Sequence, residues 1–374
     1  MIWVIIFNLA RSRSIRHISY EYMRKLKYLF VYVLPLGVYF AFNRTGFRTF
    51  SPVIFAFGVI PLLELFLKPD KGNFDAETSQ LEGRNRFYDW ILYLAVPVQL
   101  LMLVSFFYVI ELTPLYSMSF IGKVFSMGLL CGVLGINIGH ELGHRKNRWE
   151  QFLGEILLLT SLNTHFLPYH NEGHHRDVAT PGDAATAKKG QPLFSFWLTS
   201  HFGSYRKAWL LENNRMKRLG KPVVSLSNRM VSYSLANVVL ILSVYYIFEF
   251  KVLLAFLLSA VIGILLLETV NYIEHYGLLR SKNDSGRYER VKHNHSWNSD
   301  HQIGRLMLFN LSRHSDHHYK ASKKYQILDS VPESPQMPTG YPGMMLLALV
   351  PPLWFHLMHP QLSSTEEKGW KNKK

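Results

Sequence analysis

Six stretches of this chain are almost free of charged residues, and this pattern restricts its possible folds more than any other feature. The stretches cover residues 28–43, 51–66, 87–110, 116–138, 230–248 and 252–270. A bilayer core of about 30 Å requires about 20 apolar residues of helix, so the last four are long enough to cross it. The first two are shorter, but lysines at their ends can reach the membrane interface. We therefore predict an all-α integral membrane protein with six transmembrane helices.

Composition alone would not distinguish a membrane protein of this kind from a soluble protein with buried core helices. Apolar residues make up 48% of the 374 residues, but the mean hydropathy is only +0.04. Such an average is also expected when apolar spans alternate with long polar segments. The local pattern therefore favours the membrane interpretation.

The distribution of basic residues predicts how the spans are oriented. Apart from Lys123 inside a span, only Arg44, Arg48 and Lys251 fall in loops that we place outside. The other lysines and arginines lie almost entirely in the segments 1–27, 68–86, 139–229 and 271–374. Because basic loops remain on the cytoplasmic side of a membrane, we predict that both termini and both long loops are cytoplasmic.

This pattern also suggests how the chain is organised. We expect a single membrane domain over residues 28–362, with a basic interfacial arm at 1–27 and a disordered, lysine-rich tail at 363–374. The two long segments that follow the fourth and sixth spans would form a cytoplasmic, histidine-rich helical cap.

The formal net charge of +15 does not require a nucleic-acid partner. Cytoplasmic basic loops and anionic lipid explain much of it, although a basic face could also attract an acidic soluble protein. The only cysteine is Cys131, inside the fourth span. A disulfide framework and a cysteine-ligated electron carrier within this chain are therefore excluded.

Histidines are the most unusual chemical feature of the sequence. There are seventeen, and only His17 precedes residue 140. Nine of them fall in four clusters at the inner ends of spans or in the long loops. These nine are His140, His144, His170, His174, His175, His275, His314, His317 and His318.

The spacing within the clusters predicts convergence on metal ions. On a helix, a spacing of four places His140 and His144 on one face, and the same applies to His170 and His174. His175 would be rotated by about 100° and could address a neighbouring ion. Dense neutral imidazoles gain little without a cation, and imidazole suits Fe, Zn and Cu. Nine donors exceed the capacity of one ion, so we predict two metals.

One cluster also has the form of a zinc-protease motif. His140-Glu-Leu-Gly-His144 matches H-E-x-x-H, in which Glu141 would act as the general base. A zinc hydrolase needs three protein ligands and one open position, so this interpretation leaves the other clusters without a role. A metal sensor or transporter would instead need ligands near the middle of the bilayer.

Together the four motifs resemble those of the membrane alkane hydroxylases. The motifs are His140-Glu-Leu-Gly-His-Arg-Lys, His170-Asn-Glu-Gly-His-His, Asn271-Tyr-Ile-Glu-His-Tyr-Gly-Leu and Arg313-His-Ser-Asp-His-His. The histidine boxes are shared with fatty-acid desaturases and xylene monooxygenases, which remain alternatives. The third and fourth motifs are more particular to alkane hydroxylases, and the similarity extends over about residues 25–358.

The resemblance implies a specific activity, cofactor and location. The nine histidines would hold two iron ions, and residues 28–362 would form a hydroxylase domain in a bacterial inner membrane. The enzyme would be an alkane 1-monooxygenase, which converts medium- to long-chain alkanes to primary alcohols with O₂. Its electrons would have to come from outside, because the chain has no flavin or nicotinamide motif and only one cysteine. The resemblance implies rubredoxin, with rubredoxin reductase, as their source.

Several other side chains are candidates for supporting roles. Glu141, Glu172, Glu274 and Asp316 stand beside ligand positions and would orient imidazoles as hydrogen-bond acceptors, or one of them could bridge the metals. An apolar channel between the helices would bring the end of the alkane to the metals. Phe55, Phe57 and Trp90 are candidates for its lining, with lipid contact or packing as the simpler alternative for each.

Overall fold

The computed structural model describes residues 24–371, with side chains described as far as Ser364. Within this range the chain is helical and forms no strand. Six helical segments of the described chain are long and apolar enough to cross a membrane: Arg24–Phe42, Gly46–Glu64, Phe87–Glu111, Met118–Gly143, Arg229–Ile247 and Phe250–His275. The prediction of an all-α protein with six spans is confirmed. The fourth and sixth spans run further than expected and include His140 and His275 in their last turns.

Three of the spans are continuous α-helices, and three are composed of several helical segments. The continuous ones are α7 (Phe87–Glu111), α14 (Arg229–Ile247) and α15 (Phe250–His275). The first span is η1 (Lys27–Tyr32) and α3 (Val33–Phe42), and the second is η2 (Gly46–Phe50), α4 (Ser51–Ile54), η3 (Phe55–Val59) and α5 (Ile60–Glu64). The fourth is α8 (Met118–Leu130), η4 (Cys131–Asn137) and α9 (Ile138–Gly143). Both η3 and η4 are π-helices.

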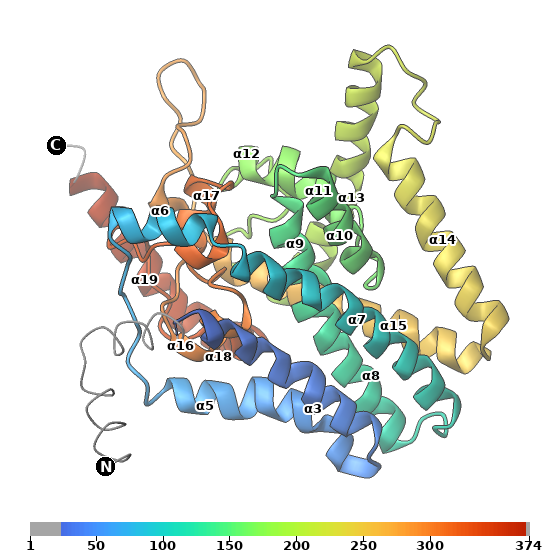
Figure 1. Ribbon diagram of the computed structural model, residues 1–374. Helices are drawn as coiled ribbons and strands as arrows, with labels where there is room; N and C mark the ends of the chain where they lie inside the picture. The colour runs from blue at the N-terminus through green and yellow to red at the C-terminus, as the bar shows by residue number, and fades with distance from the viewer. Residues whose placement is uncertain (1–23, 372–374) are drawn as a thin grey trace, which may run out of the picture.

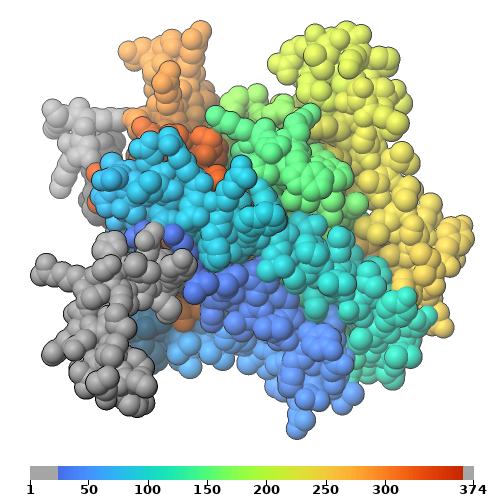
Figure 2. All heavy atoms as spheres, viewed as in Figure 1, coloured from blue at the N-terminus to red at the C-terminus, as the bar shows by residue number. Residues whose placement is uncertain are grey.

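Short turns join the spans on one side of the molecule, and the long segments lie on the other side. The turns at 43–45, 112–117 and 248–249 connect consecutive spans. The segments at 65–86, 144–228 and 276–350 all lie at the opposite ends of the spans, which we call the histidine side (Figure 1). Two parts of the histidine side, the end of α13 (Leu193–Arg218) and the segment around residues 280–292, project away from the spans (Figure 2).

The cap on the histidine side is built from two long helices, α13 and α19 (Pro351–Lys371), and many short ones. The short ones are α6 (Ala76–Arg84), α10 (Arg148–Leu159), α11 (Phe166–Tyr169), η5 (His170–His174), α12 (His175–Asp177), η6 (His293–His295), α16 (Gln302–Met307), α17 (His314–Tyr319), η7 (Tyr325–Ile327) and α18 (Tyr341–Ala348). Helix α19 continues over 363–371, so most of the tail that we expected to be disordered is helical in this structure. Residues 1–23 of the predicted basic arm lie outside the described residues.

The fourth span occupies the centre of the bundle, and its glycines allow two neighbours to approach closely. A Cβ atom on Gly128 would lie 2.5 Å from the side chain of Ile262 in α15. Farther along the span, a Cβ atom on Gly139 would lie 2.9 Å from Leu158 in α10. Glycine permits such backbone contact between membrane helices. The helix that carries His140 is therefore held between α10 and α15.

Candidate metal centre

All nine clustered histidines meet on the histidine side, in two groups. The first group contains His140, His144, His170, His175 and His317, and the second contains His174, His275, His314 and His318. Within each group, one nitrogen from every ring lies within 4.8 Å of the others. The groups adjoin, because the ring centroids of His175 and His318 are 4.5 Å apart. Four stretches far apart in the sequence thus form a single cluster.

Hydrogen bonding cannot account for the spacing of the first group. The Nε2 atoms of His140, His144 and His170 form a triangle with sides of 2.8, 2.9 and 3.1 Å. His175 Nε2 lies 3.2 Å from that of His144 and 3.0 Å from that of His170. A ring nitrogen carries either one proton or one lone pair, so a triangle can contain only one hydrogen bond. A central cation satisfies all of these lone pairs, since nitrogens about 2.0–2.1 Å from one metal ion are expected about 3 Å apart.

The second group combines four imidazoles with a nearby carboxylate. Nε2 of His174 lies 3.2 Å from Nε2 of His318, and Nε2 of His314 lies 3.1 Å from Nε2 of His275. The carboxylate of Glu274 approaches the same His314 nitrogen, with Oε2 at 3.1 Å. Its other oxygen accepts a 2.8 Å hydrogen bond from the Tyr341 hydroxyl. Glu274 therefore faces the interior of the group, as the sequence analysis anticipated for one of the carboxylates.

The cap keeps these imidazoles in the form that binds metals. Burial, with neighbouring histidines as a further cause, lowers the pKa values of six of them well below the ordinary value of 6.5: His144, His170, His175, His314, His317 and His318. A depressed imidazole pKa means that the ring is neutral at physiological pH. Neutral imidazole nitrogens are donors suited to iron, zinc or copper.

The π-helix η5 changes how the three histidines of the second motif are distributed between the two imidazole groups. The sequence analysis placed His170 and His174 on one face, with His175 directed to a neighbouring ion. In the structure His170 and His175 share the first group, while His174 belongs to the second. A π-helix has a longer repeat than an α-helix, and His170–His174 is π-helical. The expectation was therefore wrong about which two share a group, although all three rings join the cluster.

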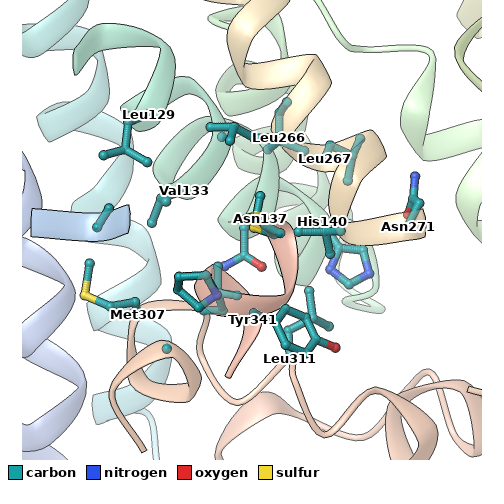
Figure 3. A pocket seen from close by; sticks show the side chains of 18 of the residues that line it. Leu129, Val133, Asn137, His140, Leu266, Leu267, Asn271, Met307, Leu311 and Tyr341 are labelled. Atoms are coloured by element: carbon teal, nitrogen blue, oxygen red, sulfur yellow. The ribbon is translucent and has the colours of Figure 1, made fainter. Parts of the chain in front are cut away.

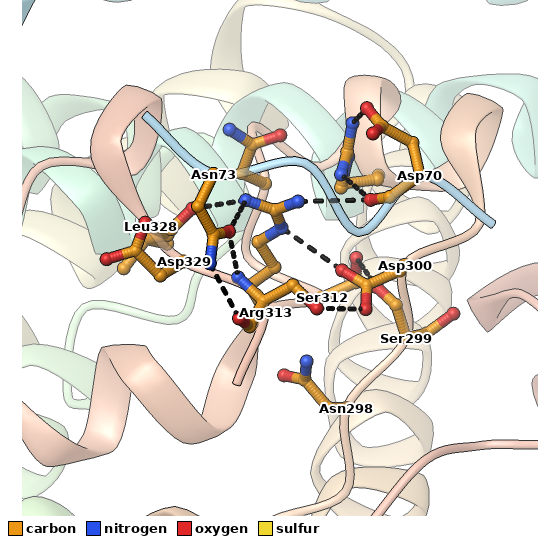
Figure 4. A network of polar contacts seen from close by, with 12 residues as sticks. Asp70, Asn73, Asn298, Ser299, Asp300, Ser312, Arg313, Leu328 and Asp329 are labelled. Carbon is orange, nitrogen blue, oxygen red and sulfur yellow. Dashed lines mark hydrogen bonds and ion pairs between the residues drawn. The ribbon is translucent and has the colours of Figure 1, made fainter. Parts of the chain in front are cut away.

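A buried arginine positions the fourth motif. Arg313 donates from Nε to Asp300 Oδ1 at 3.1 Å, from Nη1 to the Leu328 carbonyl at 2.6 Å, and from Nη2 to the Gly72 carbonyl at 2.9 Å. Asp300 also accepts a 2.6 Å bond from Ser330. Figure 4 shows this guanidinium at the meeting point of three loops. These bonds anchor the start of α17, so that His314, His317 and His318 are presented from a fixed helix.

Asp183 orients His174, and the sequence analysis did not identify it. Its Oδ2 atom lies 2.9 Å from Nδ1 of His174, and its Oδ1 accepts a 2.5 Å hydrogen bond from Tyr169. Although burial acts to raise the pKa of the Asp183 carboxyl, the His174 ring and the hydrogen bonds from Tyr169 and Thr186 hold it below its ordinary value. An anionic carboxylate on Nδ1 leaves Nε2 as the ligand atom of His174. No recognisable motif surrounds Asp183. Only its closeness in sequence to the second histidine motif could have suggested a supporting role for this residue.

Three other predicted carboxylates contact groups outside the cluster. Glu141 lies 3.0 Å from Arg145 Nη2 and 3.3 Å from the backbone nitrogen of Tyr325. Asp316 accepts a 2.6 Å bond from Lys323, and Glu172 pairs with Arg229. Glu141, Glu172 and Asp316 were expected to orient ligand imidazoles, but in the structure they pair with these other groups instead. The position of Glu141 also argues against the zinc-protease interpretation, because a general base would have to face the metal.

An apolar cavity ends at the imidazoles (Figure 3). Its walls come from the first, second, fourth and sixth spans and from the cap, and include Leu34, Phe57, Leu129, Val133, Leu266, Met307 and Met345. His140, His170, Glu274 and His314 line its polar end. Of the aromatic residues proposed for such a channel, Phe57 is part of the lining. Trp90 is instead 67% exposed on α7, on the outer surface of the bundle.

The donor set fits two metal ions of the kind that imidazole binds. Five nitrogens in one group and four nitrogens with a neighbouring carboxylate in the other satisfy two ions, and iron is among the metals that such donors suit. Several ring nitrogens have no hydrogen-bond partner among the described residues, including Nε2 of His317. A buried lone pair without a partner is unfavourable, and a metal ion would remove this penalty.

Comparison with known proteins agrees with this arrangement. Residues 117–348 match the family described as fatty acid desaturase. The chain is 37% identical to an alkane 1-monooxygenase of Pseudomonas putida over 350 residues, covering 91% of this chain and 87% of the relative. It is 39% identical to alkane 1-monooxygenase 1 of Pseudomonas aeruginosa over 320 residues, covering 85% of this chain and 84% of the relative.

A more distant relative is named for different substrates. The hydroxylase component of a xylene/toluene monooxygenase of Pseudomonas putida is 29% identical over 248 residues, covering 66% of each chain. The similarity to the two alkane 1-monooxygenases is higher and covers more of the chain. The chain therefore belongs to the fatty acid desaturase family and, within it, to the alkane 1-monooxygenases.

Proposed function

We propose that this protein is a membrane di-iron monooxygenase that hydroxylates the terminal methyl group of medium- to long-chain n-alkanes. The observation that carries the proposal is the meeting of an apolar cavity with two groups of neutral imidazoles. An inert hydrocarbon requires an apolar binding site, and its oxidation requires a redox metal. An apolar cavity and imidazoles able to hold such metals adjoin in this chain, and the alkane itself is suggested by the names of its relatives.

The chemistry explains why metals are needed. A saturated C–H bond offers no charge or polar bond to acid–base or nucleophilic side chains, so the reaction depends on a cofactor. Two irons held by His140, His144, His170, His175 and His317 and by His174, His275, His314 and His318 would supply the activation of dioxygen. Overall, one alkane, one O₂, two electrons and two protons would give one primary alcohol and one water.

The chain's own residues would bind, orient and shield the substrate. Leu129, Val133 and Met307 present apolar surface along the cavity, so an extended alkyl chain is stabilised there relative to water. The cavity narrows the choice of reacting carbon, because only an end of the chain would reach His140 and His314. Excluding water also protects the reaction from side products.

Electrons would be supplied by a separate protein on the histidine side. The chain contains one cysteine, buried in the fourth span, and cannot build an iron–sulfur carrier of its own. We propose rubredoxin, kept reduced by rubredoxin reductase, as the donor. We also propose that the histidine side and both termini face the cytoplasm of a bacterial inner membrane, because the long segments on that side carry most of the basic residues.

The proposal is tested by metal analysis and product identification on the purified protein. In lipid nanodiscs with rubredoxin, its reductase, NADH and n-octane, we expect two irons per chain and oxygen-dependent formation of 1-octanol. A His174→Ala, His314→Ala double variant should lose iron and alcohol formation together. Zinc in place of iron, an olefin as product, or alcohol formation that persists in the double variant would overturn the proposal.

A further inference from the structure

A second set of ionisable side chains lies beside the metal centre without belonging to it. His165, His201 and Glu268 come from the segment before α11, from α13 and from α15. The ring centroids of His165 and His201 are 5.2 Å apart, and Nδ1 of His201 is 3.8 Å from Oε1 of Glu268. The His201 side chain is 29% exposed, whereas that of Glu268 is only 4% exposed. The set therefore leads from the surface into the protein.

The outer end of this set opens into a polar pocket between α13 and α14. His165, His201, Thr164, Tyr205, Tyr233 and Asn237 all line it. The α14 residues of the pocket lie within the first turns after Arg229, the charged residue that begins the fifth span. Charged residues mark the boundary between a membrane span and water. The pocket therefore lies at a depth that water reaches.

The inner end of the set reaches the cavity at the metal centre. Oε2 of Glu268 accepts a 3.2 Å hydrogen bond from the side-chain nitrogen of Asn271. Asn271 lines the same cavity as His140 and Glu274 and is labelled in Figure 3. One side chain thus separates the Glu268 carboxylate from the space in which substrate would react.

Neither metal binding nor simple packing explains these residues well. Among the described residues, the groups able to converge on a metal are the two imidazole groups, and His165, His201 and Glu268 form no third one. Contact between α13 and α15 is already provided by the 2.9 Å bond from Trp197 to Thr269. An ionisable residue buried in a span is unfavourable, and such residues commonly mark proton or ion pathways.

We propose that His201 and Glu268, with His165 at the entrance, carry protons from the membrane–water boundary to the cavity. This inference rests on the proposed function, in which a reduced iron–sulfur protein supplies two electrons per O₂. One oxygen atom enters the C–H bond, and the other leaves as water after gaining two protons. Each proton would pass from water in the pocket to His201, then through a bridging water across the 3.8 Å gap to Oε1 of Glu268, and would leave the carboxylate on the side of Asn271.

The surroundings of Glu268 are consistent with proton transfer. The other ionisable groups that interact with it are Asp183, from the loop before α13, and Tyr169, from α11. Burial lowers the pKa of His165 to about 3 and also lowers the pKa of His201. Both rings are therefore neutral at rest and would hold a proton only during transfer. A neutral imidazole can accept a proton on one nitrogen and release one from the other.

The test compares Glu268→Gln and His201→Gln with Thr269→Val, which removes the bond between α13 and α15 but no proton carrier. Iron content, octanol formation and the ratio of rates in H₂O and D₂O are measured for the holoenzyme. We expect two irons in every protein. Glu268→Gln should lower turnover by about 100-fold, in line with the loss of an acid–base group, and should raise the solvent isotope effect above that of the wild type.

The outcomes separate this inference from the proposed function. Normal turnover of Glu268→Gln, or a loss of turnover with an unchanged isotope effect, would overturn the proton route while wild-type octanol formation still supports the function. An equal loss in Thr269→Val would show that packing is responsible, and would also overturn it. Partial recovery in Glu268→Asp, with an isotope effect between those of the wild type and Glu268→Gln, would support it.

Discussion

Oε2 of Glu274 lies 3.1 Å from Nε2 of His314, the same distance that separates this nitrogen from Nε2 of His275. The carboxylate thus occupies the position of a further donor to the second group, and Tyr341 holds its other oxygen. A carboxylate in that position would add negative charge to a group of four neutral imidazoles.

Removal of the Glu274 charge should weaken metal binding in the second group. We expect Glu274→Gln to lower iron affinity by about 10–100-fold, and Tyr341→Phe to have a smaller effect, because outer partners of metal ligands typically contribute this much. Iron per chain is measured after dialysis against a chelator. Tyr93 and Glu150 form a similar 2.8 Å pair away from the cluster, so Glu150→Gln serves as the control. Equal iron retention in Glu274→Gln and Glu150→Gln would contradict a role for Glu274 in metal binding.

Asp183 should matter for metal binding through His174. Asp183→Asn retains the size of the side chain but removes the anion that faces Nδ1 of His174, so we expect iron affinity to fall by about 10–100-fold. Asp177 lies close in sequence but pairs with Arg176 and Lys207 instead. Asp177→Asn should therefore keep full iron content. If both variants bind iron equally well, the orientation of His174 does not depend on this carboxylate.

A larger side chain in the cavity wall should shorten the usable alkane. Val133 lies on η4 and lines the cavity, so Val133→Trp should raise the KM for hexadecane more than that for octane, with unchanged iron content. Val104, on α7, is 50% exposed on the outer surface, and Val104→Trp should alter neither value. Competition between the two alkanes in one assay measures the change directly. An unchanged ratio of products would show that substrate does not occupy this cavity.

Electron transfer from rubredoxin should weaken as ionic strength rises. The chain carries a formal net charge of +15, and attraction between exposed charges is screened over about 10 Å at 0.1 M salt and about 3 Å at 1 M. We expect the apparent KM for rubredoxin to increase several-fold over this range, while turnover at saturating rubredoxin stays nearly constant. A KM that does not respond to salt would argue against electrostatic docking.

The histidine motifs illustrate how far the sequence leads. His140 and His144 lie on an α-helical turn, and their four-residue spacing correctly placed both rings in one group. The same reasoning failed for His170 and His174, because the intervening backbone is π-helical. An α-helical and a π-helical segment of five residues look alike in sequence, and the packing around them decides between the two.

The sequence by itself determined the six spans, the histidine side and the identity of the nine imidazoles. Apolar length and ligand chemistry are properties of local residues, and a bilayer leaves little choice other than helices. Only the tertiary structure decided which rings share a group, that Glu274 faces them while Glu141 turns to Arg145, and that Asp183 supports His174. These relationships join residues that are distant in sequence or depend on the direction of a side chain, and both follow from how the helices pack.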